Sequence, residues 1–498
     1  MPVVPDRTSC APTIPLRWIV AGCALAATLA ALAFLPGRAL LSGRTAADEP
    51  QYLLTAISLA EDRDLDIADE LGAARWRDFH ADALPRQTQP TPEGREISPH
   101  DPGLPALLAI PVALAGWAGA KSALALVAGA LAAVLAWTAV RRFGVAPGIA
   151  APTVLALTIA PPVAVYGAQV YPELPGALCV AGIVALAGAR RHRGMAVAGV
   201  VGLATAAAWL SIKYVPVAGT AAVLALWTAH RDGARRAVTA ALAAAGVLGA
   251  LYAAAHVRWY GGLTPYASGD FFAANGGQLS VMGDRPNRLA RSRRLVGLLV
   301  DRDFGLAAWQ PLWLAVVPAV AALIVRRPPR WLLLGAPLAA GWAMATWVAV
   351  TMHGWWFPGR HVLHVLPCAA LAIAWWLDRI GGGRLVAWAG VAIGALSSAW
   401  LATDAGLGDV TVVFDPWATS SPVLTAMRLL LPDMRGDAVA DQVRLAVWCA
   451  LLLAAALLAA RHERRAGPDA GATELVLDDV VAERGEVSRP GDAVERAT

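Results

Sequence analysis

The sequence is poor in charge, in lysine and in paired cysteines. Only 15% of its 498 residues are charged and 57% are hydrophobic, whereas roughly 25% of residues are charged in an average soluble domain. Lysine occurs only at positions 121 and 213, although arginine is abundant. The five cysteines are widely spaced and include no Cys-x-x-Cys pair, which argues against a cysteine metal site or a disulfide framework. These deficits indicate that a bilayer is the solvent of the chain.

Long apolar segments are what the sequence has instead. Stretches of about 17 to 22 residues recur along nearly the whole length, and each can cross a hydrocarbon core of about 30 Å. The pattern predicts an all-α fold, a polytopic transmembrane bundle in residues 1–460 with juxtamembrane helices in a large first outer loop. Twelve spans are predicted, near residues 17–36, 122–140, 147–165, 173–190, 195–212, 214–229, 237–256, 305–325, 331–350, 361–377, 384–402 and 443–460. The polar tail, 461–498, is predicted to be disordered.

Arginine clusters between the apolar segments indicate the orientation. Basic residues near helix ends stay on the cytoplasmic side, and the clusters agree with one another if the N-terminus is inside. Both termini of this multi-pass plasma-membrane protein are therefore predicted to be cytoplasmic, with outer segments near 37–103, 257–304 and 403–442. The clusters lie at 141–142, 190–193, 231–236, 326–330, 378–384 and 461–465. Because these basic residues sit in short clusters between apolar segments and do not form one continuous basic surface, we expect no nucleic-acid partner.

Two segments fit this topology poorly. The apolar piece 104–118 is short, and counting it as a span would put every later arginine cluster on the wrong side. It is predicted to be a re-entrant or interfacial helix at the outer face. Five arginines at 285–294 fall in an outer loop, against the rule that sets the orientation. Residues 287–300 are predicted to form a basic amphipathic helix along the outer surface.

Carboxylates follow the first span almost directly, in the run Asp48-Glu49-Pro50-Gln51-Tyr52. Charged groups at a membrane surface are costly unless they are solvated or used. One interpretation is that Asp48 only caps a helix that starts at Pro50, since aspartate before proline is common at helix starts. The other is that this carboxylate takes part in chemistry.

Further polar and aromatic residues are predicted on the same outer face. Each has an ordinary explanation, such as charge compensation at a helix start, snorkelling to headgroups or an interfacial tryptophan belt. Their common placement on one face favours a binding site. They are His100, Tyr171, Glu173, Lys213, Tyr214, Arg302, His353, Trp355, Trp356 and Arg360.

The arrangement of these motifs resembles the GT-C superfamily of polytopic glycosyltransferases, which includes protein O-mannosyltransferases and lipid A aminoarabinose transferases. The resemblance rests on the Asp48-Glu49 run after the first span, the run that ends Pro99-His100-Asp101-Pro102-Gly103, and Tyr171-Pro172-Glu173. It covers roughly residues 15–400. Two departures are Asp101, where relatives often have a small or apolar residue, and Glu173 in place of aspartate.

The resemblance implies a transfer of sugar from a polyprenyl-phosphate donor to an envelope acceptor (glycan, lipid or protein) on the outer face. It implies that Asp48 is catalytic, with Glu49 as the less favoured holder of that role. A base must deprotonate the acceptor and cations must stabilise the departing phosphate. We assign the phosphate to Lys213, Arg302, Arg360 and His100. The substrate-binding residues are predicted to be Tyr52, Tyr171, Glu173, Tyr214, His353, Trp355 and Trp356.

Other functions stay open at this point. A transporter or flippase of lipid-linked sugars would use similar surfaces, but it would be expected to carry ionisable or helix-breaking residues near the middle of several spans. An inactive assembly partner in envelope synthesis is a third interpretation, against which the intact acidic motif argues. The sequence assigns no cofactor, names no metal ligand and leaves a requirement for a divalent cation open.

Overall fold

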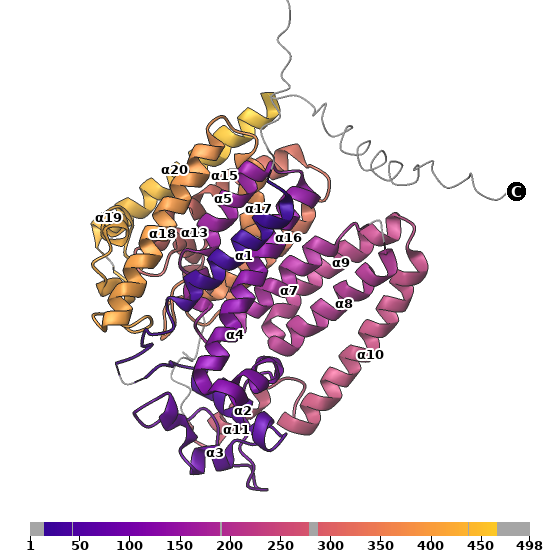
Figure 1. Ribbon diagram of the computed structural model, residues 1–498, viewed down its shortest axis with the longest axis vertical. Coiled ribbons are helices and arrows are strands. Elements are labelled where there is room, and N and C mark those ends of the chain that lie inside the picture. The colour runs from indigo at the N-terminus through magenta and orange to yellow at the C-terminus, as the bar shows by residue number, and fades with distance from the viewer. Residues whose placement is uncertain (1–13, 42, 190–191, 278–286, 437, 466–498) are drawn as a thin grey trace, which may run out of the picture.

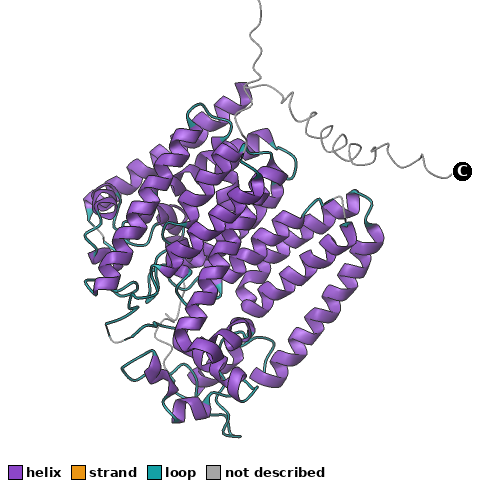
Figure 2. Cartoon of the chain, viewed as in Figure 1, coloured by secondary structure: helices purple, strands orange, loops and turns teal. Residues whose placement is uncertain are grey.

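The computed structural model describes residues 14–41, 43–189, 192–277, 287–436 and 438–465. Every regular element in these ranges is a helix (Figure 2), as the apolar pattern predicts. The expected tail falls mostly outside the described residues, and so do Arg190, Arg191 and Arg285. The last helix, α20, continues to Arg465, a few residues past the predicted end of the last span.

Helices cover all twelve predicted spans. Seven are long and apolar enough to cross a membrane by length and composition, and five shorter apolar helices of 10–17 residues occupy the other positions. The long ones are α4 (Gly103–Phe143), α8 (Arg193–Leu210), η2 with α9 (Ile212–Arg231), α10 (Arg235–Tyr260), η5 with α17 (Arg360–Leu377), α18 (Gly383–Leu407) and α20 (Val439–Arg465). The shorter ones are α1 (Leu16–Leu32), α5 (Pro147–Thr158), α7 (Glu173–Leu186), η3 with α15 (Pro311–Arg326) and α16 with η4 (Leu332–Val348).

Short helices fill the connections. They are α2 (Glu49–Glu61), α3 (Ala68–Gly72), η1 (Arg75–Asp78), α6 (Val163–Tyr166), α11 (Tyr266–Ala274), α12 (Arg288–Arg291), α13 (Arg294–Val300), α14 (Leu306–Trp309), η6 (Pro416–Ala418) and α19 (Pro422–Leu430). The helices α2, α3 and α11 gather at one end of the molecule, opposite the C-terminal end of α20 (Figure 1). This gathering separates a loop-rich end from the body of the bundle.

Small residues allow the first helix to pack closely on α4. A Cβ atom on Gly129 would lie 2.1 Å from Thr28 Oγ1 and 2.8 Å from the Ala24 carbonyl oxygen, and one on Gly167 would lie 2.4 Å from Ala31 Cβ. Helix packing in membranes depends on such small side chains, because apolar burial drives little association between helices in lipid. The close contact fixes the end of α1, from which the chain continues to Asp48.

The short apolar piece at 104–118 forms a helix of its own, as the sequence predicted, although it is continuous in the chain with the next span and both belong to the 41-residue element α4. Non-helical backbone angles at Ala115 and Gly116 form a kink that separates the two helices. Gly116 has a φ of +55° and a ψ of −144°, a conformation that glycine adopts at little cost. Before the break, Leu104 and Leu108 are buried, whereas Leu114 is 82% exposed. The segment therefore has one protein-facing side and one apolar side that suits lipid.

The prediction of one continuous amphipathic helix over 287–300 is wrong. The chain forms two short helices there, α12 and α13, which are interrupted at Ser292 and Arg293. Arg291 and Arg294 donate hydrogen bonds to the carbonyl oxygens of Trp347, Ala349 and Val350. Cations at a helix C-terminus satisfy its last carbonyls and its dipole. Arg291 and Arg294 thus stabilise the end of a neighbouring helix, which gives a reason for their position in a predicted outer loop.

The three predicted outer segments contact one another. Ser268 Oγ donates to the Ile97 carbonyl oxygen at 2.7 Å, which joins the second segment to the first. The Val412 amide donates to the Arg38 carbonyl oxygen at 2.9 Å, and the Arg302 amide donates to that of Pro432 at 2.9 Å. The third segment therefore meets both others, and the candidate residues are carried by one continuous loop region.

Candidate functional site

Asp48 immediately precedes α2 but does not cap it. Its φ and ψ are −85° and −16°, and its side chain accepts no hydrogen bond from the first turn. The carboxylate instead points to Arg360, whose Nη2 donates to Asp48 Oδ2 at 2.6 Å. The interpretation of Asp48 as a helix cap is therefore wrong, since the side chain is committed to an ion pair with a residue 312 positions away.

The neighbouring Glu49 has a different environment. Its side chain is completely buried, and its two oxygens accept from backbone amides, Oε1 from Ala46 at 3.1 Å and Oε2 from Val170 at 2.8 Å. Both oxygens are thus used to fasten the start of α2 to the segment after α6. This geometry favours a structural role for Glu49 and leaves the catalytic prediction to Asp48.

Arg360 is the centre of the site. It begins the 3₁₀ segment η5, it is 7% exposed, and its Nε donates to Glu173 Oε1 at 2.8 Å. Its guanidinium carbon lies 4.1 Å from the ring centroid of Tyr171 and 5.0 Å from that of Trp356. A planar guanidinium can bind carboxylates along its edge and stack on aromatic faces at the same time. The remaining nitrogen, Nη1, makes no hydrogen bond within the described ranges.

Lys213 shares the same carboxylate. Its Nζ donates to Glu173 Oε1 at 2.8 Å and lies 5.2 Å from the ring centroid of Tyr214, and the side chain is 32% exposed. Glu173 is 1% exposed, and its second oxygen, Oε2, has no hydrogen-bond partner among the described residues. The buried Tyr214 hydroxyl is likewise unpaired there. Unpaired buried polar atoms are costly, so their presence beside two cations indicates a place for a ligand.

His100 reaches Asp48 through a residue that the sequence did not single out. The ring of His100 stacks on Tyr52 with 4.7 Å between centroids, and its Nε2 lies 3.0 Å from Gln87 Oε1. Gln87 Nε2 in turn donates to Asp48 Oδ1 at 3.4 Å. A lone glutamine in a polar loop carries no sequence signal, so only the fold reveals the connection.

The charges around Asp48 determine its protonation. Burial raises the pKa of the Asp48 carboxyl, but the cations Arg360 and Lys213 lower it by more, so the pKa lies well below the ordinary aspartate value. The pKa of His100 is lowered, mainly because burial disfavours the imidazolium. At neutral pH the site therefore combines an ionised Asp48 with a neutral histidine, whose single N–H is directed to Gln87 Oε1.

Three predicted residues lie away from Asp48, and two of them, Arg302 and His353, belong to a second cluster. Arg302 Nη2 pairs with Asp433 Oδ2 at 2.7 Å. The ring of His353 contacts Phe304, with 4.8 Å between centroids. Trp355 is 61% exposed and neighbours Phe414. No contact within the described parts of the chain joins these three side chains to Asp48. Their roles in donor or substrate binding stay predictions without geometric support.

Asp101, one of the two departures from the family pattern, connects the site to neighbouring segments through hydrogen bonds. It is 3% exposed, and its Oδ1 accepts from the Tyr252 hydroxyl at 2.7 Å and lies 3.1 Å from His256 Nε2. Its Oδ2 accepts from the amide of Ile212, the residue before Lys213, at 3.0 Å. Asp101 thus ties the His100 run, the Lys213 hairpin and α10 together. Sequence spacing gave no indication of the pairing with α10.

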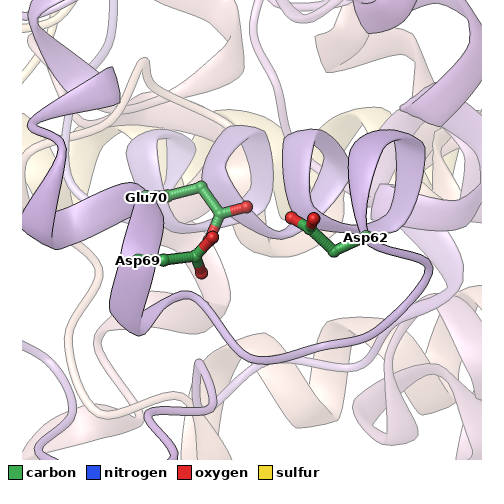
Figure 3. A group of neighbouring side chains, drawn as sticks. All are labelled: Asp62, Asp69 and Glu70. Carbon is green, nitrogen blue, oxygen red and sulfur yellow. The ribbon is translucent and has the colours of Figure 1, made fainter.

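A carboxylate group elsewhere has the spacing of a cation site. Figure 3 shows Asp69 and Glu70 of α3 beside Asp62 at the end of α2, and one oxygen from each lies within 4.8 Å of the others. Burial and the neighbouring Asp69 raise the pKa of Glu70 to about 8, so a cation would have to displace its proton. In the described chain, no such trio includes Asp48, and the metal requirement stays open.

Comparison with known proteins adds a likeness in fold. No family model matches the sequence, and a search of curated proteins gives no significant match. Among solved structures, ArnT from Cupriavidus metallidurans, crystallised with bound undecaprenyl phosphate, matches 96% of this chain and 82% of its own chain. The TM-score is 0.50 and the sequence identity is 17%. The match confirms the predicted polytopic helical fold, which is similar to that of ArnT; at this identity it shows the fold and not the activity.

Proposed function

We propose that this protein is a membrane glycosyltransferase that moves a sugar from a polyprenyl-phosphate donor to an acceptor at the outer face. The observation that carries the proposal is the cluster of Asp48, Glu173, Lys213 and Arg360, which brings two carboxylates and two cations from four separate segments to one place. Its unpaired buried atoms, Glu173 Oε2 and the Tyr214 hydroxyl, support a ligand at this position. The likeness to ArnT, whose structure holds undecaprenyl phosphate, supports a lipid-phosphate donor.

The reaction assigns a role to each charged side chain. The acceptor hydroxyl oxygen forms a bond to the anomeric carbon, and the bond from that carbon to the donor phosphate breaks. Its electron pair leaves with the phosphate, while the hydroxyl proton passes to Asp48. The phosphate gains one negative charge in this step, which Lys213 and Arg360 stabilise. His100 holds Gln87 beside Asp48 and would donate to the phosphate only after its N–H leaves Gln87 Oε1. The faces of Tyr52, Tyr171, Tyr214 and Trp356 contact sugar or isoprenoid.

The resting geometry explains how Asp48 becomes a base. While Arg360 holds it, Asp48 has a low pKa and is a weak proton acceptor. A donor phosphate next to Lys213 and Arg360 would neutralise the two cations that hold this pKa down, and the free Nη1 of Arg360 gives it a first point of attachment. Arg360 is then shared with the phosphate, and the pKa of Asp48 rises when the donor is in place. Donor binding and base activation are coupled by one guanidinium.

A transporter or flippase of lipid-linked sugars is the alternative. The positions of the charges favour an enzyme, because Glu173 begins α7, Arg360 begins η5 and Lys213 lies between α8 and α9. All are at element ends and none is at a helix centre, where transport sites are found. In proteoliposomes, an enzyme should consume the donor in proportion to the sugar transferred. Movement of intact donor across the bilayer without transfer would identify a transporter.

The orientation belongs to the same proposal. The first loop region should be outside and both termini inside, as the arginine clusters predict. A cysteine placed at exposed position Arg86 should react with an impermeant thiol reagent applied to intact cells, and one at exposed position Gly194 should react only after permeabilisation. The opposite labelling pattern would invert the topology and place the site on the wrong face for an outer acceptor.

The direct test of function compares Asp48→Asn with Glu49→Gln in transfer of radiolabelled sugar from polyprenyl phosphate. Removing the base should lower the turnover rate by about 10²- to 10⁴-fold, with no loss of donor affinity, because Arg360 loses a competing anion. Glu49→Gln should lower thermal stability, because it weakens two hydrogen bonds, and should leave the turnover of folded protein near the parental value. Parental turnover in Asp48→Asn would remove Asp48 from the mechanism.

A further inference from the structure

A cavity of about 570 Å³ is lined in part by the His100 run, through Ile97, Pro102 and Gly103. Arg63, Arg95 and Arg258 line it together with Trp209 and Trp259. Arg63 and Arg95 come from the first outer segment, whereas the other three come from the ends of α8 and α10. The same end of α10 adjoins the gathering of α2 and α11 in Figure 1. The cavity thus lies where the membrane-spanning helices meet the loop region.

The arginines of this cavity are free to bind a ligand. In the part of the chain that the structure describes, the side chains of Arg63, Arg95 and Arg258 make no hydrogen bond or salt bridge. The cavity also contains Asp64 and Asp66, and each uses one carboxylate oxygen in local hydrogen bonds. Asp64 Oδ1 accepts from Ser58 Oγ and from the Asp66 amide, and Asp66 Oδ1 accepts from the amides of Ala68 and Glu96. Three arginines outnumber the two aspartates, so the lining carries a net positive charge, and of these charged side chains only the arginines have no such partner among the described residues.

Arg63 occupies a backbone position that favours glycine. Its φ is +66°, in the left-handed region that non-glycine residues rarely adopt. Its amide closes the end of α2 by donating to the Ser58 carbonyl oxygen at 2.9 Å, the geometry of a helix C-terminus that commonly carries glycine. An arginine here is conformationally unfavourable, and its side chain lines the cavity. An unfavourable backbone conformation that is retained at a cavity wall supports a functional role for the side chain.

The tryptophans give the cavity an amphiphilic wall. Trp209 and Trp259 lie edge to face, with 6.1 Å between ring centroids. Tryptophan suits the boundary between acyl chains and headgroups, since one side of its ring is apolar and its N–H is polar. Guanidinium groups beside such rings can bind an anionic headgroup through paired hydrogen bonds. The cavity therefore matches a ligand with a negatively charged head and an apolar remainder.

We propose that this cavity binds the negatively charged headgroup of an outer-leaflet amphiphile, and that this amphiphile is the acceptor of the transferred sugar. The acceptor role rests on the proposed function, whereas the binding of an anionic headgroup does not. The His100 run carries both sites: Ile97, Pro102 and Gly103 line the cavity, while the ring of His100 between them stacks on Tyr52 next to Asp48. An amphiphile whose headgroup is bound by the arginines would present a hydroxyl to Asp48 by extending across the His100 run.

The binding half is tested with dihexanoyl phosphatidic acid as the anionic probe. Its zwitterionic counterpart, dihexanoyl phosphatidylcholine, and inorganic phosphate serve as comparison ligands. The variant Arg63→Gly/Arg258→Gln removes two cations, and the glycine relieves the positive φ, so the fold should be retained. We expect phosphatidic acid to bind the variant at least about tenfold more weakly than the parent, which corresponds to about 1.4 kcal/mol. Arg86→Gln, an exposed arginine of the same segment that does not line the cavity, is the matched control and should bind like the parent.

Each alternative result has a defined meaning. Equal binding of phosphatidic acid by the parent and the double variant would overturn the proposal. So would a loss of binding in Arg360→Gln with none in the double variant, which would place the probe at the donor site. Phosphatidylcholine that binds as tightly as phosphatidic acid would show that charge is not recognised, and inorganic phosphate that binds as tightly would assign the cavity to a soluble anion.

The acceptor half is tested by transfer assays on the same proteins. Phosphatidic acid should slow sugar transfer by the parent and not by the double variant, and it should leave binding of polyprenyl phosphate unchanged. Binding in the cavity without slower transfer would overturn the acceptor role. If the parent transfers no sugar from any polyprenyl-phosphate donor tested, the proposed function fails, while the ratio of phosphatidic acid affinities still decides whether the cavity binds anionic headgroups.

Discussion

Two clusters of buried carboxylates paired with arginines lie in the loop region, and they differ in how deeply the arginines are buried and in how many segments they join. In the Asp48 cluster, Arg360 retains an unused nitrogen and Glu173 an unpaired oxygen. In the second cluster, Asp303 pairs with Arg428 at 3.1 Å and with Arg435. The adjacent Asp301 fills both of its oxygens with the amides of Asp303, Phe304 and Met434.

The second cluster joins the segment before α14 to α19 and the segment after it, and its arginines pair with acids of these segments. It also contains buried atoms without a hydrogen-bond partner among the described residues, Arg302 Nε and His353 Nε2, so unpaired atoms alone do not separate a ligand site from a structural ion pair. The Asp48 cluster joins four segments, and its central arginine is 7% exposed, whereas Arg302, Arg428 and Arg435 are 30–44% exposed. The depth of the cation, where charge interactions are less screened by water, is what distinguishes the proposed site.

The largest expected effect comes from substituting one arginine in each cluster and comparing the two variants. Arg360→Gln should weaken binding of polyprenyl phosphate by about 10- to 100-fold, because a charge-assisted hydrogen bond contributes about 1.5–3 kcal/mol. Arg302→Gln should leave donor affinity unchanged and lower the melting temperature, because it loses the pair with Asp433. Titration of both purified variants with polyprenyl phosphate, together with thermal unfolding, measures the two effects. Equal loss of affinity in both would return Arg302 to the phosphate site.

A smaller effect is expected in the pH dependence of the rate. Asp48 must be ionised to accept a proton, so the rate falls as pH decreases through its pKa. In the free enzyme Arg360 holds this pKa below the ordinary value of about 3.9, and kcat/KM, which reports free enzyme, should stay flat down to about pH 4.5. With donor bound, the shared arginine releases Asp48, and the acidic limb of kcat should lie at higher pH. Identical acidic limbs in kcat and kcat/KM would contradict partner exchange.

Local sequence patterns were enough to predict the helices and part of the site. Apolar length located all twelve predicted helices, and the position of Asp48 after the first one, with Glu173, Lys213 and Arg360 on the same face, predicted residues that the fold brings together. These predictions succeed because spans are defined by local composition and because charge at a helix end is conspicuous in a sequence so poor in it.

Long-range pairing is what the sequence could not supply. Arg302 has the same residue type and predicted face as Arg360, yet its partner Asp433 lies in a loop 131 residues away. Gln87 and Asp101 gain their importance only from contacts with Asp48 and with α10. The break between α12 and α13 depends on carbonyls of η4 that attract Arg291 and Arg294. Each of these outcomes depends on which segments meet, and hydrophobic periodicity does not encode that.

The central claim is that Arg360 passes from Asp48 to the donor phosphate, and one structure tests it most directly. An experimental structure of the protein with undecaprenyl phosphate bound should place a phosphate oxygen within hydrogen-bond distance of Arg360 and Lys213. In the same structure the contact between Arg360 Nη2 and Asp48 Oδ2, which is 2.6 Å here, should be lengthened or lost. A phosphate bound elsewhere with that ion pair intact would contradict the account.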